Sequence, residues 1–399
     1  MSILLSDRVR QLAPSATLSV TERVTQLREQ GVRVISLNMG EPDFGTPENI
    51  CEAAMRAIRD QRTKYTTVSG ILPLREAICE KLRRDNGVDY SPAQVTVCTG
   101  AKQALFNAVS ALCGSGDEVL LPTPCWVSYV EMVKLAGGVP VFVRCREETG
   151  FALEVEAVER ALTPRTKAIL LNTPNNPTGA VYTRQALRAL SELAVRHGFY
   201  IISDEVYEKL VYDGAEHVCA ASFSPEAKRQ TVVVNGMSKA YAMTGWRVGY
   251  AAADEAIIRA MNAVQGHVTS NACTVSQYAA LEALTGPQES VEAMRAEFAR
   301  RRLFLLEALR AIPGVRCANA QGAFYLLPNV SAFYGRRCGT QRIDGAASLA
   351  AYLLEQAHTA LVPGEAFEAP DCLRIAYANS MKQLKEGAAR IRAALERLD

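Results

Sequence analysis

The sequence lacks long hydrophobic runs and a strong excess of charge of either sign. No apolar stretch approaches the length that spans a bilayer, and the opening MSILLSDRVR is charged too early for a secretory segment. The 399 residues carry a formal net charge of +2 without a basic block, which disfavours nucleic acid and anionic membranes as partners. We therefore expect a cytoplasmic protein with no membrane partner.

Patterns that bind metals or form disulfides are also missing. Eleven cysteines are scattered singly without a CxxC pair, and only four histidines occur. The odd cysteine count favours reduced thiols, and we expect neither a structural zinc site nor any other metal. The GxGxxG spacing of dinucleotide-binding folds is absent as well, which disfavours a NAD-dependent dehydrogenase.

What the sequence does contain is a regular alternation of apolar strand-like runs and amphipathic helical patterns. A chain of this length predicts two domains, and the alternation predicts an α/β fold with helices on both sides of a mainly parallel, seven-stranded sheet. In such sheets, ligands bind beyond the carboxyl ends of the strands. The expected strands are 94–98, 118–122, 139–143, 168–172, 200–203, 231–235 and 248–252, and expected helices include 101–113, 184–197 and 206–211.

The pattern changes after residue 280. A long charged helix is expected over 289–312, followed by short strands near 323–327 and 373–377 and a closing helix over 381–398. This predicts a smaller α+β domain. We expect an N-terminal arm and small-domain segment over 1–45, a large domain over 46–285 that carries the strand-end ligand site, and a small C-terminal domain over 286–399.

A lysine follows the expected strand 231–235 in an unusual setting. Lys239 lies in NGMSKAYAMTGWRVGY among small and apolar neighbours, with Arg247 eight residues later. Such a lysine either extends to solvent or stays desolvated, in which case its pKa falls unless its charge is paired. A lowered pKa is what a nucleophilic amine needs.

Other residues suited to ligand binding follow the other strands. Gly100 opens a helix where an anion can bind, and Trp126 is either a core residue or a flat platform for an aromatic ligand. Asn176 presents its amide to a ligand or caps its own turn, and Asp204 is a helix cap or a buried counter-charge. Arg374 forms a carboxylate fork or a structural ion pair. Together these groups match the demands of pyridoxal phosphate on a protein.

Six motifs resemble the class I/II aminotransferases of pyridoxal-phosphate fold type I, in the order of that family. The resemblance covers essentially the whole chain and implies a pyridoxal 5′-phosphate enzyme with a ping-pong, Schiff-base mechanism. No single motif is specific for this family, but the six motifs together are. They are GEPDF (40–44), KYTTVSG (64–70), NNPTG (175–179), SDEVY (203–207), SKAYAMTGWRVGY (238–250) and LRIAYA (373–378).

The resemblance assigns a role to each matching residue. Lys239 resembles the Schiff-base lysine and general base, Asp204 the acid at the pyridine nitrogen, and Arg374 the fork for the substrate α-carboxylate, with the Gly40 backbone nearby. Tyr65 resembles a tyrosine that reaches the phosphate of a partner subunit, which implies a homodimer with shared active sites. The remaining matches are Tyr207 and Asn176 at the 3′ oxygen, Trp126 stacked on the ring, and Gly100, Ala101, Lys102, Ser238 and Arg247 around the phosphate.

The substrate is predicted from a finer resemblance. Ser15, Thr17 and Lys102 resemble residues that serve a distal carboxylate in bacterial aspartate aminotransferases, although Ser15 and Thr17 are equally suited to cap the first helix. We expect aspartate and 2-oxoglutarate as substrates. Aromatic amino acids, prephenate and alanine stay open, as do a fold type I lyase and a non-catalytic cofactor-binding regulator.

Overall fold

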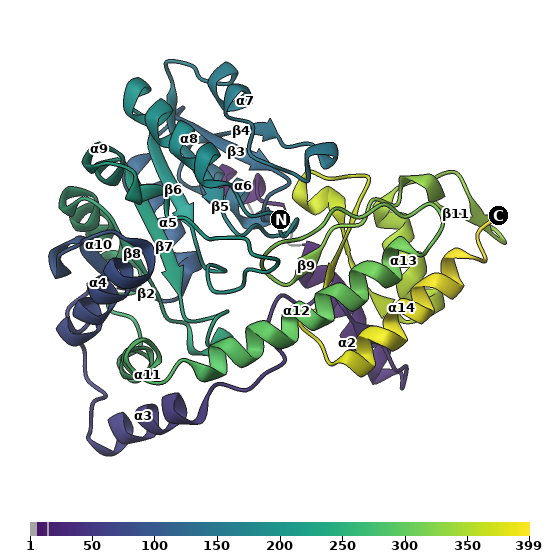
Figure 1. Ribbon diagram of the computed structural model, residues 1–399, viewed down its shortest axis with the longest axis horizontal. Helices are drawn as coiled ribbons and strands as arrows, with labels where there is room; N and C mark the ends of the chain where they lie inside the picture. The colour runs from purple at the N-terminus through teal and green to yellow at the C-terminus, as the bar shows by residue number, and fades with distance from the viewer. Residues whose placement is uncertain (1–5, 14–15) are drawn as a thin grey trace, which may run out of the picture.

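The computed structural model describes residues 6–13 and 16–399 and contains two lobes. The large lobe is built on a seven-stranded sheet, and the small lobe on a three-stranded sheet with flanking helices. Helix α12 (Glu289–Arg310) runs from one lobe to the other (Figure 1). The expected domain boundaries at residues 45 and 285 stay a prediction.

The seven-stranded sheet confirms the predicted α/β class. Its strand order is β2-β8-β7-β6-β5-β3-β4, and every neighbouring pair is parallel except the two pairs that include β8. Each strand matches one of the seven apolar runs. The strands are β2 (Val95–Cys98), β3 (Glu118–Thr123), β4 (Val139–Arg144), β5 (Thr166–Asn172), β6 (Tyr200–Asp204), β7 (Thr231–Gly236) and β8 (Gly249–Ala252).

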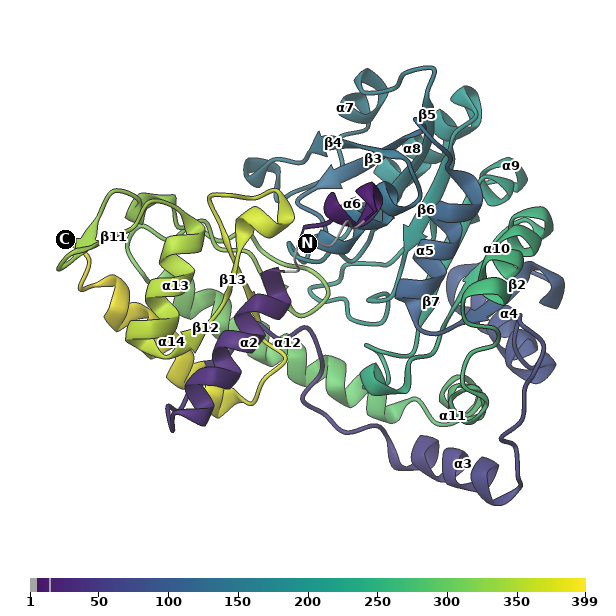
Figure 2. The ribbon, with the colours of Figure 1, turned by 180° about the vertical axis from the view of Figure 1, so that it is seen from behind.

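Helices cover both faces of this sheet, which explains why the central strands are apolar without alternation. In β5, Ala168 and Leu170 pack in the core shared with α5, α6 and α10, whereas Ile169 and Leu171 pack on the opposite face in the core shared with α8. Figure 2 shows the helices of the first face in front of the sheet. The large-lobe helices are α3 (Glu48–Arg59), α4 (Leu72–Asn86), α5 (Ala101–Leu112), α6 (Val127–Leu135), α7 (Val155–Arg160), α8 (Arg184–His197), α9 (Pro225–Arg229), α10 (Glu255–Val268) and α11 (Thr274–Thr285).

Of the three helices expected between the strands of the large sheet, two are present and one is not, and the helices expected over 289–312 and 381–398 are present as α12 and α14 (Met381–Leu395). The patterns at 101–113 and 184–197 form α5 and α8, and Thr183 caps α8 by accepting the Ala186 amide. The expected helix over 206–211 is wrong, because these residues form turns. Here the chain leaves β6 and pairs with the other lobe through the bridge between Val211 and Gly322.

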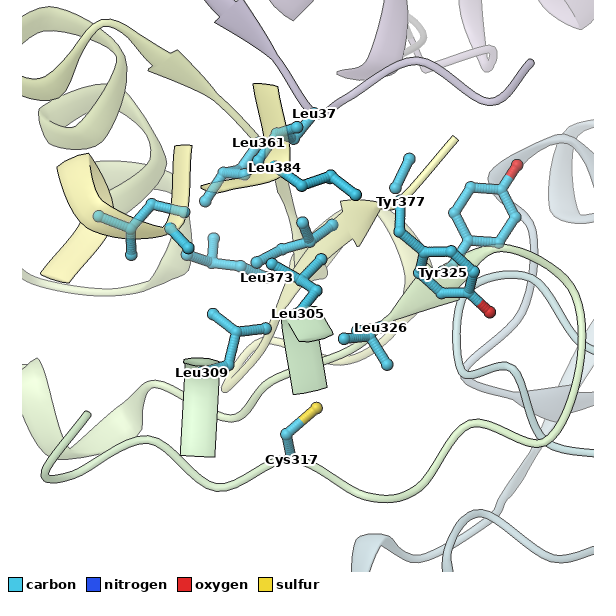
Figure 3. Close-up of a cluster of buried hydrophobic side chains, with 14 of the residues drawn as sticks. Leu37, Leu305, Leu309, Cys317, Tyr325, Leu326, Leu361, Leu373, Tyr377 and Leu384 are labelled. Atoms are coloured by element: carbon cyan, nitrogen blue, oxygen red, sulfur yellow. The ribbon is translucent and has the colours of Figure 1, made fainter. Parts of the chain in front are cut away.

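The small lobe has a core of its own. Its antiparallel sheet has the order β13-β14-β9, which confirms the strand pair expected near 323–327 and 373–377. Leucines fill the middle of this core, and Tyr325 lies at its edge (Figure 3). Strand β1 pairs with β12, so the N-terminal segment joins this lobe, as expected. The elements of this lobe are α2 (Ala16–Glu29), β1 (Ile35–Ser36), β9 (Tyr325–Leu326), β10 (Arg337–Cys338), β11 (Gln341–Arg342), α13 (Ala346–Ala357), β12 (Thr359–Ala360), β13 (Val362–Pro363), β14 (Leu373–Ala376) and α14 (Met381–Leu395). The short helix α1 (Asp7–Arg10) lies against α6 of the large lobe.

Two further observations bear on the exclusions made from the sequence. None of the eleven cysteines, all of which lie within the described residues, is paired in a disulfide. Among the residues that the structure describes, none of the helices combines the length and the apolar character needed to cross a membrane.

Candidate active site

One pocket of about 400 Å³ collects the polar residues that follow the strands of the large sheet. It lies where the carboxyl ends of β5, β6 and β7 meet the small lobe, the position expected for ligands in such sheets. Its volume is within the range of small-molecule sites. The residues predicted from the sequence that line this pocket are Gly40, Ala101, Lys102, Trp126, Asn176, Asp204, Tyr207, Ser238, Lys239, Arg247 and Arg374.

Lys239 is held inside this pocket three residues after β7 ends. Its Nζ donates a hydrogen bond to the Gly40 carbonyl at 2.5 Å, so the side chain does not extend into bulk solvent. Burial lowers the pKa of Lys239 to about 8, and the nearby Arg374 adds to the decrease, whereas Glu41 opposes it. About a tenth of this amine is therefore neutral at pH 7, far more than at the ordinary lysine pKa of 10.5, and the neutral form is the one that nucleophilic or base chemistry requires.

Asp204 ends β6 and is only 4% exposed. Its Oδ2 accepts a hydrogen bond from the Tyr129 hydroxyl at 2.7 Å, and its Oδ1 accepts one from the Val206 amide at 3.3 Å. Of the two alternatives from the sequence, the buried acid is observed. The carboxylate accepts an amide of the turn that follows β6, and no helix begins there for it to cap. Burial raises the pKa of Asp204 to about 6, although the Tyr129 hydrogen bond counteracts this increase.

Tyr129 lies on α6, three residues after Trp126, and was not singled out in the sequence. One helical turn places the two rings edge to face, with centroids 5.4 Å apart. Tyr129 thus contacts both the aromatic platform and the buried acid.

The Tyr129 hydroxyl gives a testable pH dependence. Without it, Y129F should raise the pKa of Asp204 further above the unfolded value of 3.8, so the charged carboxylate is buried at a greater cost. We expect the loss in unfolding free energy of the apoprotein to be about 1–3 kcal/mol at pH 7 and clearly smaller at pH 5, where Asp204 is largely protonated in both proteins. Urea unfolding at the two pH values measures this difference.

A matched control for Y129F is Y212F. The Tyr212 hydroxyl is also buried but donates to the neutral carbonyl of Ala323 at 2.6 Å. The Y212F loss should be equal at pH 5 and pH 7. An equal loss at both pH values for Y129F would contradict the stated effect on Asp204.

A second group of residues forms a cradle for an anion. Gly100 has φ +82°, and a Cβ at this position would lie 2.7 Å from Nη2 of Arg247. This close approach sets the Arg247 guanidinium beside the first turn of α5, whose free amides favour an anion. Ser238 lies on the same lining and is buried. Lys102 lies above the Trp126 ring, 4.6 Å from its centroid.

Arg374 reaches the pocket from β14 of the small lobe and is 2% exposed. Its guanidinium lies between the rings of Tyr325 and Phe367, at 4.7 and 4.9 Å from their centroids. One Nη donates to Asn176 Oδ1 at 3.1 Å and the other to the Asn38 carbonyl at 2.7 Å, while the buried Nε has no protein partner among the described residues. Within residues 6–13 and 16–399 its polar partners are an amide oxygen and a backbone carbonyl, so the structural ion pair considered for it is not observed there.

Four of the predicted site residues do not line this pocket. Gly100 lies directly behind the lining, against Arg247. Tyr65 is 90% exposed and borders a different surface hollow, near Asn271 and Cys273. Ser15 lies outside the described residues. Thr17 falls within α2, but its side chain is outside the described part of the structure.

The charges that line the pocket define the ligand that it suits. Among the described residues of the lining, four cationic side chains face two acidic ones, so a ligand with several negative charges is favoured. The acids are Asp204 and Glu41, and the Glu41 carboxylate accepts a hydrogen bond from Thr244 at 3.0 Å. Glu41 and Tyr325 were both missed in the sequence, because neither follows a strand of the large sheet.

Comparisons with known proteins agree with this geometry. The profile described as aminotransferase class I and II matches residues 32–391. An aspartate aminotransferase of Geobacillus stearothermophilus is 49% identical, with 98% of this chain and 99% of the relative covered. An aspartate/prephenate aminotransferase of Cereibacter sphaeroides is also 49% identical, with 98% of each chain covered.

Solved structures show the same relationship in three dimensions. The crystal structure of the aspartate aminotransferase from Rhizobium meliloti superposes with a TM-score of 0.96 at 43% identity and covers 100% of both chains. The Thermus thermophilus aspartate aminotransferase with maleate superposes at 0.93 with 45% identity, over 98% of this chain and 100% of that one. From its profile, its relatives and its fold, the chain belongs to the class I and II aminotransferases.

Proposed function

We propose that this aminotransferase uses pyridoxal 5′-phosphate to move an amino group between L-aspartate and 2-oxoglutarate. The observation that carries the proposal is the convergence of Lys239, Asp204 and Arg374 on one pocket from three separate elements. An amine with a lowered pKa, a buried acid and a buried guanidinium without a carboxylate partner are the three groups that this chemistry needs at one place.

The residues present fit the cofactor. A phosphate suits the cradle that is formed by Gly100, the first turn of α5 and Arg247. A side chain at residue 100 would fill the space beside the Arg247 guanidinium. Asp204 offers a carboxylate to a ring nitrogen, and Trp126 offers a flat face to the ring. When bound, the cofactor supplies an aldehyde for covalent attachment and a ring that accepts electrons. In this proposal Ala101, Lys102 and Ser238 assist at the phosphate, and Tyr207 and Asn176 donate to the 3′ oxygen.

The proton transfers fall to Lys239. Once the substrate amine has displaced it, the free Lys239 Nζ would take the proton from the substrate Cα and deliver it to the carbon on the other side of the substrate nitrogen. An amine whose pKa is about 8 is well matched to this task near neutral pH. Arg374 holds the α-carboxylate through its fork, and the Gly40 backbone lies beside it. The two substrate pairs use the site in turn, so ping-pong kinetics are expected.

The choice of aspartate rests on Lys102 and on the relatives. Lys102 lines the pocket at the Trp126 face and carries a charge that suits a second carboxylate. Several relatives are named aspartate aminotransferases, at 44–49% identity for three of them. A panel of amino donors with 2-oxoglutarate as acceptor tests the proposal. Aspartate should give the highest kcat/KM, and a higher value for alanine or phenylalanine would contradict the assignment.

Prephenate is a second candidate amino acceptor. Its support is the Cereibacter sphaeroides relative, which is named an aspartate/prephenate aminotransferase. Incubation with aspartate and prephenate, with and without enzyme, tests whether prephenate accepts the amino group in place of 2-oxoglutarate. Release of oxo acid from an amino acid with no acceptor present would instead indicate a lyase.

Lys102 provides a sharper test of substrate choice. We expect K102A to lower kcat/KM for aspartate by roughly 10-fold or more relative to phenylalanine, because only aspartate loses a charge-assisted contact. Steady-state kinetics with both donors measure this ratio. Equal losses for the two donors would limit Lys102 to the phosphate end of the site.

The assembly and location complete the proposal. We propose a homodimer in which Tyr65, which is 90% exposed in the single chain, reaches the phosphate in the partner's site. We also propose a cytoplasmic location, which the eleven free thiols support.

A further inference from the structure

Tyr325 makes a contact that links the two lobes at the pocket. It lies on β9 of the small lobe and is 1% exposed, at the edge of the core shown in Figure 3. Its hydroxyl lies 2.9 Å from the hydroxyl of Tyr207, which comes from the large lobe and is 4% exposed. Neither hydroxyl has another hydrogen-bond partner within the described ranges 6–13 and 16–399.

Only one proton can lie between these two oxygens, so one tyrosine donates and the other accepts. The surroundings favour Tyr325 as the donor. The Arg374 guanidinium lies over the Tyr325 ring, 4.7 Å from its centroid, whereas the cation over the Tyr207 ring, Lys239 Nζ, is farther away at 5.8 Å. A closer cation withdraws more electron density from the phenol and makes its hydroxyl the better donor. Gly40 packs tightly against the same hydroxyl, because a Cβ on Gly40 would lie 2.7 Å from the Tyr325 oxygen.

If Tyr325 donates, the proton of Tyr207 is free to point into the pocket that Tyr207 lines. We infer that Tyr325 is a positioning residue, which orients the Tyr207 hydroxyl to donate to the 3′ oxygen of the cofactor. This inference rests on the proposed function. It goes further, because it gives a role to a small-lobe tyrosine that touches the carboxylate-binding arginine on one side and the cofactor-binding tyrosine on the other.

The inference has a direct spectroscopic consequence. A hydrogen bond from Tyr325 makes Tyr207 a stronger donor, since successive hydrogen bonds polarise one another. Y325F removes that bond and keeps the ring beneath Arg374. The negative charge on the 3′ oxygen is then less stabilised by Tyr207. This charge attracts the proton on the Lys239 nitrogen more strongly, and the nitrogen therefore loses its proton less readily. The visible absorption of the holoenzyme should therefore titrate at a higher pH.

The experiment is a spectrophotometric titration of the purified holoenzymes between pH 5 and 10. We expect the midpoint of Y325F to lie above that of the wild type by about half a pH unit, the size of one modest hydrogen bond. Y212F is the matched control, because it removes a buried hydroxyl from the same core without touching Tyr207. Its midpoint should equal that of the wild type. An unchanged midpoint in Y325F overturns the inference.

A double-mutant cycle tests whether Tyr325 acts through Tyr207. Y207F alone should raise the midpoint, and Y207F/Y325F should show the same midpoint as Y207F, because the second change then has no target. Two independent shifts that add would overturn the inference. If the wild type itself shows no visible absorption with added cofactor, the proposed function has failed. If the wild type titrates normally and the midpoint of Y325F does not shift, only the inference about Tyr325 has failed.

Discussion

Replacing Lys239 with alanine is expected to lower the transamination rate by about 10⁴-fold, the upper range for the loss of a general acid–base catalyst. The variant loses both the amine that binds the cofactor aldehyde and the base that moves the Cα proton. The protein should also be colourless after gel filtration, because no covalent link retains the cofactor. Steady-state kinetics with aspartate and 2-oxoglutarate, together with a visible spectrum, measure both effects.

K239R separates amine chemistry from charge. Arginine keeps a cation near the Gly40 carbonyl but stays protonated at any working pH, so it cannot act as a nucleophile. We expect K239R to be as inactive as K239A. Substantial transamination by either variant would show that another group carries the reaction. In the wild-type apoprotein, the rate of cofactor attachment should rise with pH through about 8, because only the neutral amine attacks the aldehyde.

Arg374 is expected to have the second largest effect. R374A should lower kcat/KM for every amino acid by about 2–5 kcal/mol in transition-state binding, roughly 30-fold or more, because a buried carboxylate then loses its charged partner. The loss should fall mainly on KM and should be similar for aspartate and phenylalanine, since both carry the same α-carboxylate. Steady-state kinetics with the two donors measure it.

R374K is the matched variant for Arg374. Lysine keeps the charge but cannot donate through two parallel N–H groups, nor lie flat between Tyr325 and Phe367 as the guanidinium does. Its activity should recover only partly. An R374A enzyme with an unchanged KM would remove this residue from the substrate site.

Most of the fold was predictable because its signals are local. Each strand of the large sheet is a short apolar run, and helices α5 and α8 follow helical periodicity with clear ends at Gly100 and Gly198. The failure at 206–211 has a physical cause. Val206, Tyr207 and Leu210 are buried at helical spacing, yet they pack in the small-lobe core at a point where the chain crosses between lobes. Tertiary packing therefore produced a helical pattern without a helix.

The candidate site was predictable to the extent that it follows strand ends. Asp204 ends β6, while Lys239 and Asn176 lie within four residues of the ends of β7 and β5. Parallel strands bring their carboxyl ends together. Tyr129 and Tyr325 were not predictable in this way, because their roles depend on contacts with Asp204 and Tyr207 across long sequence separations. A tyrosine in an apolar run carries no mark of the partner that its hydroxyl meets.

The most direct test of the central claim is chemical trapping of the lysine. Borohydride reduces the bond between a lysine nitrogen and the cofactor aldehyde carbon to a stable amine, which survives proteolysis. Peptide mass mapping of the reduced holoenzyme should find the pyridoxyl group on Lys239 alone, in one copy per chain. Modification of a different lysine, or of none, would contradict the account.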